Sequence, residues 1–293
     1  MNVGEKIKKL RTAKLMTQSD LVGSEITRNM LSRIENGAAN PSLETVCYLA
    51  SRLNVSPGYL LADKEDERVF IKYNEIVGIK KAFVSEDYRI CRDICKRSDI
   101  SSDDEIQMIL SECNLAIAIE EFFNGELREC CAFLDEAVEN CGSTLYRTDY
   151  TVAAAGVYFR YMRSISATLT SNEIDESEVN IYPAMIDEFC RYACLLERHD
   201  NGEDISDAEI NMIGRPDSPY VLHLMAVMCM KRGAFSEAHS YLRAVLLSES
   251  TVPQPVLYHI FCDLEICCRE IGDFKGAYEY SMGKLEILQK LLS

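Results

Sequence analysis

A short segment near the N-terminus carries polar side chains that could contact a nucleic acid. At helical spacing its apolar residues, Met30 or Leu31 together with Ile34, can face a core. The side chains left on the other face are Arg28, Asn29, Ser32 and Arg33. Arginine suits the major-groove edge of guanine and asparagine that of adenine, because each pairing makes two hydrogen bonds. A solvated helix face has the same composition, so the segment by itself leaves both interpretations open.

Five short helices are predicted around this segment, each opened by a residue that can cap a helix. The predicted N-caps are Asn2, Thr17, Thr27, Ser42 and Ser56. Asp20 follows Thr17 at the spacing of a capping box, and Pro57 suits the first position of the fifth helix. Gly23 and Gly37 supply the ends of the second and third helices. The first sixty residues therefore read as a small all-helical head.

Several motifs in this head occur together over about sixty residues. They are Thr17-Gln18, Ser32-Arg33-Ile34-Glu35-Asn36-Gly37, Pro41-Ser42-Leu43, Leu49-Ala50 and Leu53-Asn54-Val55. In this combination the head resembles the Cro/CI-type (XRE family) helix-turn-helix domain. Between Leu21 and Thr27 the chain has one residue fewer than the commonest pattern of that family, which implies a tighter turn before the third helix.

The resemblance implies roles for individual side chains. In that family the residue after the cap of the second helix contacts a phosphate, which points to Gln18 here, and Asn36 matches the position that holds the next phosphate. Arg28 and Asn29 match the positions that reach bases, and Met30 matches one that touches a thymine methyl group. The complete expected set of DNA-contacting residues is Gln18, Thr27, Arg28, Asn29, Met30, Ser32, Arg33 and Asn36.

The charge is divided unevenly between this head and the rest of the chain. The 293 residues carry a formal net charge of −16. Residues 1–62 contain eight Lys or Arg against five Asp or Glu, a net +3, which leaves 23 basic against 42 acidic residues, a net −19, for the remainder. A basic head can approach phosphate, whereas an acidic body is repelled by it. The division predicts two domains with different partners.

The domain boundary is expected at a run of charged residues. Residues 63–68, DKEDER, are all charged, so no core could bury them. The predicted organisation is a DNA-binding domain at 1–62, a charged linker at 63–68 and a helical domain at 69–293. The linker could equally be the solvated first turn of a long connecting helix.

The acidic body is predicted to be all-α. Its apolar residues recur at helical spacing, and no proline falls between Pro57 and Pro183. Three segments are alike: in each, a glycine is followed two residues later by a bulky apolar residue and three further on by a small one. The glycines are Gly125, Gly233 and Gly272, the bulky residues Leu127, Phe235 and Phe274, and the small ones Cys130, Ala238 and Ala277. The glycine is expected to end a helix and the bulky residue to pack between two helices.

These segments resemble tetratricopeptide-type helical hairpins. Gly233 and Gly272 are 39 residues apart, and Gly125 lies 108 residues before Gly233, close to multiples of the usual repeat of about 34 residues. The tryptophan and glycine usual in the first helix of such a repeat are absent, and an irregular helical bundle is the alternative. A helix-turn-helix head on such a body resembles the peptide-sensing RRNPP-type regulators. That likeness implies a sensor architecture without naming the signal.

An effector would then be expected on the concave face, which the first helix of each hairpin lines. The candidate effector-binding residues are Tyr220, His223, Val227 and Lys231 on one such helix and His259, Asp263, Ile266 and Arg269 on the next. Aromatic, donor and acceptor groups at this spacing could hold a peptide. An ordinary helix surface or a dimer interface would use the same residues.

The sequence carries no motif for catalysis or for a cofactor. There is no glycine-rich phosphate loop and no Gly-x-Ser-x-Gly, and the four histidines lack zinc-ligand spacing. Cys91/Cys95 and Cys190/Cys194 are i, i+4 pairs without a second pair at a recognisable spacing, so burial in a core is favoured over a metal site. We therefore expect no enzyme activity, no cofactor and no metal. We also expect a cytoplasmic protein, because no apolar run is long enough to cross a bilayer.

Two function classes remain at this stage. The first is a DNA-binding transcription regulator, expected to be a homodimer on double-stranded DNA, whose body senses a peptide or another small effector. The second is an interaction scaffold whose head only tethers it. Arg28, Asn29 and Arg33 favour the first, because a head that did not read DNA would not need them.

Overall fold

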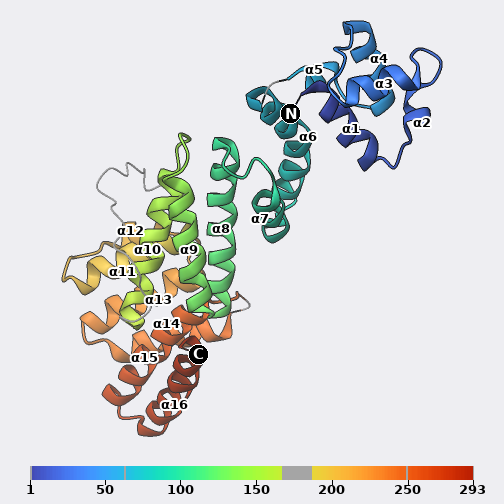
Figure 1. Ribbon diagram of the computed structural model, residues 1–293. Coiled ribbons are helices and arrows are strands. Elements are labelled where there is room, and N and C mark those ends of the chain that lie inside the picture. Colours follow the sequence, from blue (N-terminus) through green and yellow to red (C-terminus); the bar gives the residue numbers. More distant parts are fainter. Residues whose placement is uncertain (1, 63, 167–186, 249, 293) are drawn as a thin grey trace. The chain divides into compact units, whose positions relative to one another are not determined.

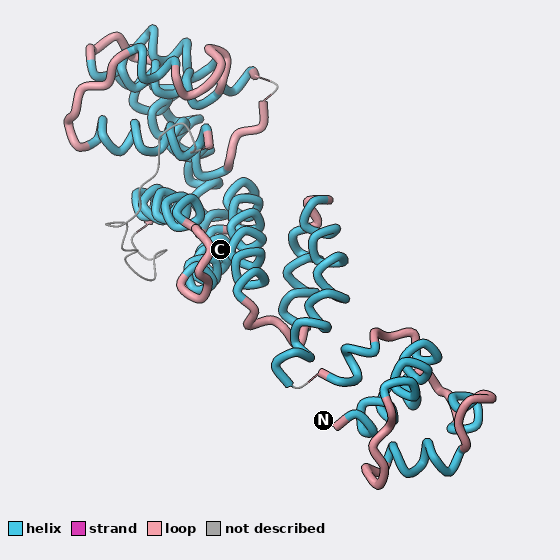
Figure 2. The backbone as a smooth tube through the Cα atoms, turned by 90° about the horizontal axis from the view of Figure 1, so that it is seen from above, coloured by secondary structure: helices cyan, strands magenta, loops and turns pink. Residues whose placement is uncertain are grey.

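The computed structural model describes residues 2–62, 64–166, 187–248 and 250–292, and every regular element in these ranges is a helix (Figures 1 and 2). The first helices are α1 (Val3–Ala13), α2 (Gln18–Val22), α3 (Arg28–Glu35), α4 (Leu43–Leu53), α5 (Pro57–Leu61) and α6 (Lys64–Val84). The middle helices are α7 (Tyr88–Arg97), α8 (Asp104–Asn124), α9 (Leu127–Cys141), α10 (Asp149–Ile165), α11 (Glu188–Asp200) and α12 (Asp207–Asn211). The last are α13 (Pro219–Lys231), α14 (Phe235–Leu247), α15 (Gln254–Glu270) and α16 (Phe274–Leu291). The all-α prediction is confirmed.

Packing divides the chain into two units. The first is Met1–Val84 with Arg97–Ser101, and the second is Ser85–Lys96 with Ser102–Ser293. Of the predicted linker at 63–68, Asp63 lies outside the described residues and Lys64 begins α6. Residues 167–186 of the predicted helical domain also lie outside the described residues. The domain limits read from the sequence stay a prediction.

The head is organised by the caps that the sequence predicts. The side chains of Asn2, Thr17, Thr27, Ser42 and Ser56 each accept a hydrogen bond from the backbone of the following turn. Each of the five helices then contributes to one core, whose fully buried members include Ile7, Leu21, Leu31, Leu49 and Leu60. Local capping thus fixes where each helix starts, and burial of one apolar stripe from each helix fixes how the five pack.

A buried lysine joins the first helix of the head to its last. Lys6 is only 1% exposed, and its ammonium group donates hydrogen bonds to the carbonyls of Tyr59 (3.0 Å) and Ala62 (2.8 Å). The ammonium also lies 5.2 Å from the centre of the Tyr59 ring. A buried charge is tolerated only when it is paired in this way. Lys6 therefore ties α1 to the end of α5.

The second unit contains the expected helical hairpins. α8 packs along α9, α13 along α14, and α15 along α16, as the ribbon in Figure 1 shows. The glycines between them, Gly125, Gly233 and Gly272, have φ of 86°, 76° and 83°. A left-handed residue at this place ends a helix and lets the next one start, and glycine adopts it without a side-chain penalty. The prediction that a glycine ends the first helix of each hairpin is confirmed.

One detail of the repeat pattern is wrong. Leu127 is 1% exposed and packs in the core as expected, but Phe274, at the matching position of the last hairpin, is 74% exposed. The small residues Cys130, Ala238 and Ala277 are all buried. Leu127 lies where α8, α9 and α10 pack together, whereas α16 packs mainly along α15 among the described helices.

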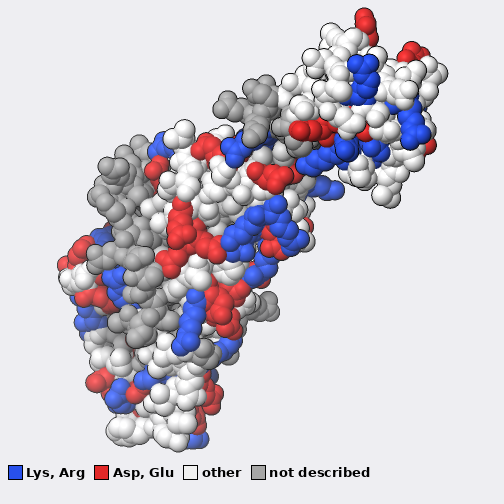
Figure 3. All heavy atoms as spheres, in the orientation of Figure 1, with Lys and Arg blue, Asp and Glu red and all other residues white. Residues whose placement is uncertain are grey.

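Charged side chains are mixed over the surface of the second unit. On the face shown in Figure 3, basic and acidic side chains lie next to one another. Arg92 and Lys96 both reach Glu136, each at 2.7 Å, and Arg89 lies 3.2 Å from Glu120. Among the described helices, none is both long enough and apolar enough to cross a membrane.

Candidate nucleic-acid interface

The third helix of the head divides its residues into a buried and an exposed set. Thr27 caps α3, because its hydroxyl accepts a hydrogen bond from the Met30 N–H at 3.2 Å. Leu31 and Ile34 are buried, at 0% and 1% exposed, whereas Met30 is 45% exposed. Of the two alternatives read from the sequence, Leu31 is the core residue. Met30 is therefore left on the outer face.

The outer face of α3 and its two caps carry most of the residues expected to contact DNA, and Gln18 begins α2. Thr27, Arg28, Asn29, Met30, Arg33 and Asn36 are exposed, and Gln18 and Ser32 are half-buried. Arg28 and Asn29 stand in the first turn of α3, and Asn36 follows its last residue. The helix thus presents donors along one side and ends with a further amide.

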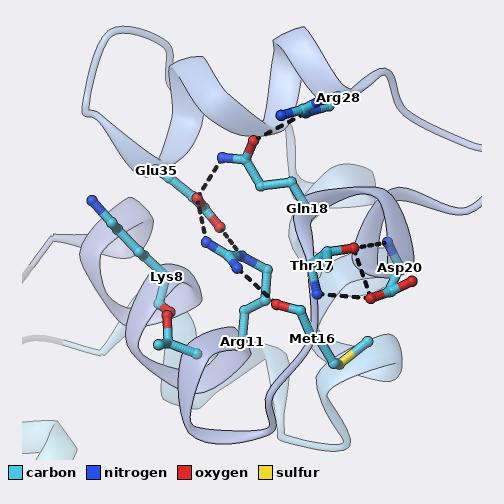
Figure 4. A network of polar contacts seen from close by, with 9 residues as sticks. Lys8, Arg11, Met16, Thr17, Gln18, Asp20, Arg28 and Glu35 are labelled. Atoms are coloured by element: carbon cyan, nitrogen blue, oxygen red, sulfur yellow. Dashed lines mark hydrogen bonds and ion pairs between the residues drawn. The ribbon is translucent and has the colours of Figure 1, made fainter.

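A network of polar contacts supports this face from behind (Figure 4). Glu35, 5% exposed, accepts hydrogen bonds from the guanidinium of Arg11 at 2.7 and 3.1 Å. Its second oxygen also accepts one from Gln18 Nε2 at 2.8 Å, and Gln18 Oε1 accepts a long one from Arg28 Nε at 3.5 Å. Arg11 donates a further bond to the Met16 carbonyl at 2.8 Å. The chain of contacts runs from α1 through Glu35 and Gln18 to the first turn of α3.

The network keeps Glu35 ionised although it is buried. Burial alone would raise the pKa of Glu35, but the hydrogen bonds from Arg11 and Gln18 outweigh it and lower the pKa below its usual value. The same bond to Glu35 raises the pKa of Arg11. Both groups are charged at neutral pH, so the pair is a fixed ionic anchor between α1 and α3.

The second set of expected residues, those for an effector, is distributed differently. Tyr220, His223, Val227 and Lys231 lie on α13, and His259, Asp263, Ile266 and Arg269 lie on α15, two helices that contact one another. His223 and Val227 are buried at 1% and 7% exposed. α13 is contacted by α11, α14 and α15, so its four candidate side chains do not share one open surface.

Two of these residues are joined through a buried chain of polar groups. His223 Nε2 lies 2.9 Å from Asp263 Oδ2, and His223 Nδ1 lies 2.7 Å from the Tyr192 hydroxyl. That hydroxyl is 3.5 Å from the hydroxyl of Tyr161. The chain links α10, α11, α13 and α15. The sequence did not point to Tyr161 or Tyr192. Tyr161 is 31 residues from Tyr192, and Tyr192 is 31 residues from His223, so no local pattern pairs them.

His259 lies at the side of this chain. Its Nε2 is 3.2 Å from the Ser164 hydroxyl, and its ring centre is 5.2 Å from that of Tyr161. Burial, together with the nearby His223, lowers the pKa of His259 to about 4, against the opposite effect of Asp263. His259 is therefore neutral at physiological pH.

Tyr220 lines a cavity of about 730 Å³ in the second unit. Its aromatic wall includes Tyr150, Tyr158 and Phe189, and its polar residues include Asp187 and Arg215. A second cavity, of about 340 Å³, is lined by Tyr161, Ser164 and Asn201 among others. Apolar walls with a few polar groups at these volumes are typical of sites for small ligands.

The cysteines are mostly core residues. Of the thirteen, nine are buried, and Cys47 is the exposed one. Of the pairs noted in the sequence, Cys91, Cys95 and Cys190 are buried and Cys194 is half-buried. In the described ranges, no three His, Cys, Asp or Glu side chains are grouped so that they could hold a metal ion.

Comparison with protein families identifies the head. Residues 7–60 match the family model described as helix-turn-helix, so the first five helices form a helix-turn-helix domain. That part of the resemblance seen in the sequence is confirmed. No curated protein matches the chain at a significant level.

The solved structures that match this chain include three regulators. PlcR of Bacillus thuringiensis, in complex with the peptide PapR7 and DNA, is 13% identical, with 99% of this chain and 96% of that chain covered and a TM-score of 0.24. The SHP pheromone receptor Rgg2 of Streptococcus dysgalactiae is 11% identical, with 97% and 99% covered and a TM-score of 0.20. The competence regulator ComR of Streptococcus vestibularis is 17% identical, with 97% and 91% covered and a TM-score of 0.21. At TM-scores this low, these likenesses do not bear on what this chain binds.

Proposed function

Because residues 7–60 form a helix-turn-helix domain, we propose that the chain is a sequence-specific DNA-binding transcription regulator. In this proposal it acts as a homodimer, and its second unit binds a peptide or another small effector. One observation carries the DNA-binding proposal: the exposed face of α3, with Arg28 and Asn29 in its first turn, is supported from behind by the Glu35–Gln18 contacts.

The geometry of α3 suits insertion into the major groove. The N-terminal residues of a recognition helix contact base edges, and here those residues are Arg28 and Asn29. In the proposal Arg28 pairs with guanine and Asn29 with adenine, while Gln18 and Asn36 bind phosphates on either side. Glu35 holds the Gln18 amide, so less side-chain entropy is lost when DNA binds.

A gel-shift assay with the DNA upstream of the protein's own coding sequence tests this proposal. Replacing Arg28 or Asn29 by alanine should cost about 1–3 kcal/mol at the specific site and relax the base preference at one position. Gln18→Ala and Asn36→Ala should weaken binding to all sequences about equally, because phosphate contacts carry no sequence information.

Lys14 provides a control of matched charge. It is exposed at the end of α1, outside the α3 face, and Lys14→Ala removes the same unit charge as Arg28→Ala. We expect Lys14→Ala to leave the base preference unchanged. Equal effects of the two substitutions on affinity and base preference would contradict the assignment of α3 as the reading helix.

The effector part of the proposal rests on the cavity beside Tyr220. Its volume of about 730 Å³ and its aromatic wall suit a short peptide segment, and Arg215 and Asp187 offer a donor and an acceptor. The net charge of −19 outside the head favours a cationic peptide, because opposite charge speeds encounter. Asp263 and the other α15 candidates would then transmit binding through the buried contacts of His223.

Mass spectrometry of ligands that co-purify with the protein, followed by calorimetry, tests the effector site. Tyr220→Ala and Asp263→Ala should weaken binding of a recovered ligand. Tyr278→Ala, which alters a 67% exposed tyrosine on α16, should not. A ligand whose affinity is the same for Tyr220→Ala, Asp263→Ala and the wild type would place the effector site elsewhere.

A further inference from the structure

The second unit contains a small cavity between α10 and α11, apart from the one beside Tyr220. Its volume is about 340 Å³, close to the lower limit of roughly 300 Å³ for ligand sites, so it suits one small molecule better than a peptide segment. The inner part of its lining is apolar, because Val157, Tyr161 and Ala193 are buried and Leu196 is half-buried. Both helices belong to the second unit and contact one another.

The polar part of this lining contains two cations and two anions. Arg160 and Glu197 pair with each other, with 3.1 Å between Nε and Oε2, and so join α10 to α11. Arg163 is exposed and makes no ion pair or hydrogen bond with a described residue. Asp200 contacts His199 Nδ1 through Oδ1 at 3.3 Å, and its Oδ2 has no such contact within the described ranges. One cation and one anion thus remain for a ligand.

These two charges define the class of ligand. Arg163 and Asp200 stand on neighbouring helices and line the same cavity, and no ion pair joins them among the described contacts. A guanidinium group binds a carboxylate with two parallel hydrogen bonds, and a carboxylate oxygen accepts a hydrogen bond from an ammonium group. A simple anion or a simple amine would use only one of the two side chains. A zwitterion uses both, and an apolar group on it gains free energy when it is buried against Val157 and Leu196.

We propose that the cavity between α10 and α11 binds a free α-amino acid with an apolar side chain. Arg163 binds its carboxylate, Asp200 binds its ammonium group, and the apolar part of the lining contacts its side chain. Asn201, exposed at the end of α11, offers a further hydrogen bond. This cavity shares no lining residue with the one beside Tyr220, so the inference goes beyond the peptide effector proposed above and does not depend on it.

Isothermal titration calorimetry of the full chain with three probes tests the class of ligand. L-leucine carries both charges, isocaproate lacks the amino group and isoamylamine lacks the carboxylate. We expect one L-leucine to bind per chain, and each of the other two to bind at least about fivefold more weakly, because each lacks one charged hydrogen-bonding group. Isocaproate or isoamylamine that bound as tightly as L-leucine would overturn the proposal. Absence of binding by L-leucine, L-valine and L-phenylalanine alike at millimolar concentration would overturn it as well.

Neutral substitutions test which side chains hold the amino acid. Arg163→Gln and Asp200→Asn each remove one charge, and each should weaken L-leucine binding at least about fivefold. Arg147→Gln and Asp217→Asn are the matched controls, because they remove the same charges from side chains that are 84% and 73% exposed and lie outside the cavity lining. Both controls should bind L-leucine like the wild type.

Thermal unfolding followed by circular dichroism shows whether the four variants are folded, so that a loss of binding is not mistaken for a loss of structure. Wild-type affinity in either Arg163→Gln or Asp200→Asn would contradict the assigned pair. Equal losses in the folded control variants would contradict it too, because they would show that net charge, and not these two side chains, determines the affinity. The measurement uses no DNA, so its outcome is independent of whether α3 reads bases.

Discussion

Glu35 joins the scaffold of the head to its DNA-facing surface. It is buried, it holds Arg11 with two hydrogen bonds, and it holds Gln18 with a third. The exposed residues of α3 could be read from the sequence, because they follow from helical spacing and a capping threonine. The role of Glu35 could not, because its partners lie 24 and 17 residues away.

Breaking this anchor should destabilise the head. Arg11→Met leaves the buried Glu35 carboxylate without its cation, and we expect a loss of about 3 kcal/mol in the free energy of unfolding. Lys9→Met, an exposed change on the same helix, should cost less than about 0.5 kcal/mol. Urea unfolding followed by circular dichroism measures both. Similar losses for the two variants would mean that the Arg11–Glu35 pair contributes little.

His259 gives the second unit a predictable response to pH. Burial and His223 lower its folded-state pKa from 6.5 to about 4. Between these values the unfolded chain binds a proton that the folded chain does not, so the free energy of unfolding falls as the pH drops from about 6.5 toward about 4. In His259→Gln this contribution is absent, and its stability should depend less on pH. Urea unfolding of both proteins between about pH 7 and pH 5 checks this, and identical pH slopes would contradict it.

The helical hairpins show why the elements were easier to predict than their packing. Glycines ending α8, α13 and α15 are local signals, since a left-handed residue stops a helix wherever it occurs. Phe274 shows the limit, because whether a bulky residue is covered depends on elements elsewhere in the chain. The buried hydrogen-bonded chain from Tyr161 to Asp263 also depends on distant elements, because its residues meet only after four helices have packed together.

Two hairpin glycines with the same backbone geometry should differ in their tolerance of alanine. Gly125 and Gly272 have φ of 86° and 83°, so alanine costs about 1–2 kcal/mol at either position. A methyl group at Gly125 would also lie 3.0 Å from Gln254 Cβ and 3.1 Å from Leu291 Cδ2, whereas one at Gly272 meets nothing within 4 Å. Gly125→Ala should therefore lose roughly a further 1–3 kcal/mol, because crowding in a packed contact adds to the backbone strain. Urea unfolding measures the difference in the free energy of unfolding. Equal losses for the two variants would show that α15 and α16 shift to make room for the methyl group at Gly125.

At the level of the whole molecule, the division of charge argues that one head is not enough. A head of net +3 neutralises few phosphates, and the rest of the chain, at −19, cannot help, so binding by one head should be weak at physiological salt. Two heads on one duplex double the contacts and require two half-sites on the same face of the DNA. The charge division was visible in the sequence, because it needs only a count of the charged residues on either side of residue 62.

The proposed dimer predicts a strict dependence on the distance between the half-sites. Two-fold helix-turn-helix proteins read half-sites about one helical turn, roughly 10 base pairs, apart. Inserting about five base pairs turns one half-site to the opposite face of the duplex, and should reduce the affinity to that of a single half-site. Footprinting first locates the half-sites, and fluorescence anisotropy with native and lengthened spacers then measures the affinity. An insertion of about ten base pairs is the control for length alone, because it returns both half-sites to one face of the duplex. If the affinity of the wild-type protein did not change with spacer length, the two heads would be binding independently, and the dimer on DNA would be contradicted.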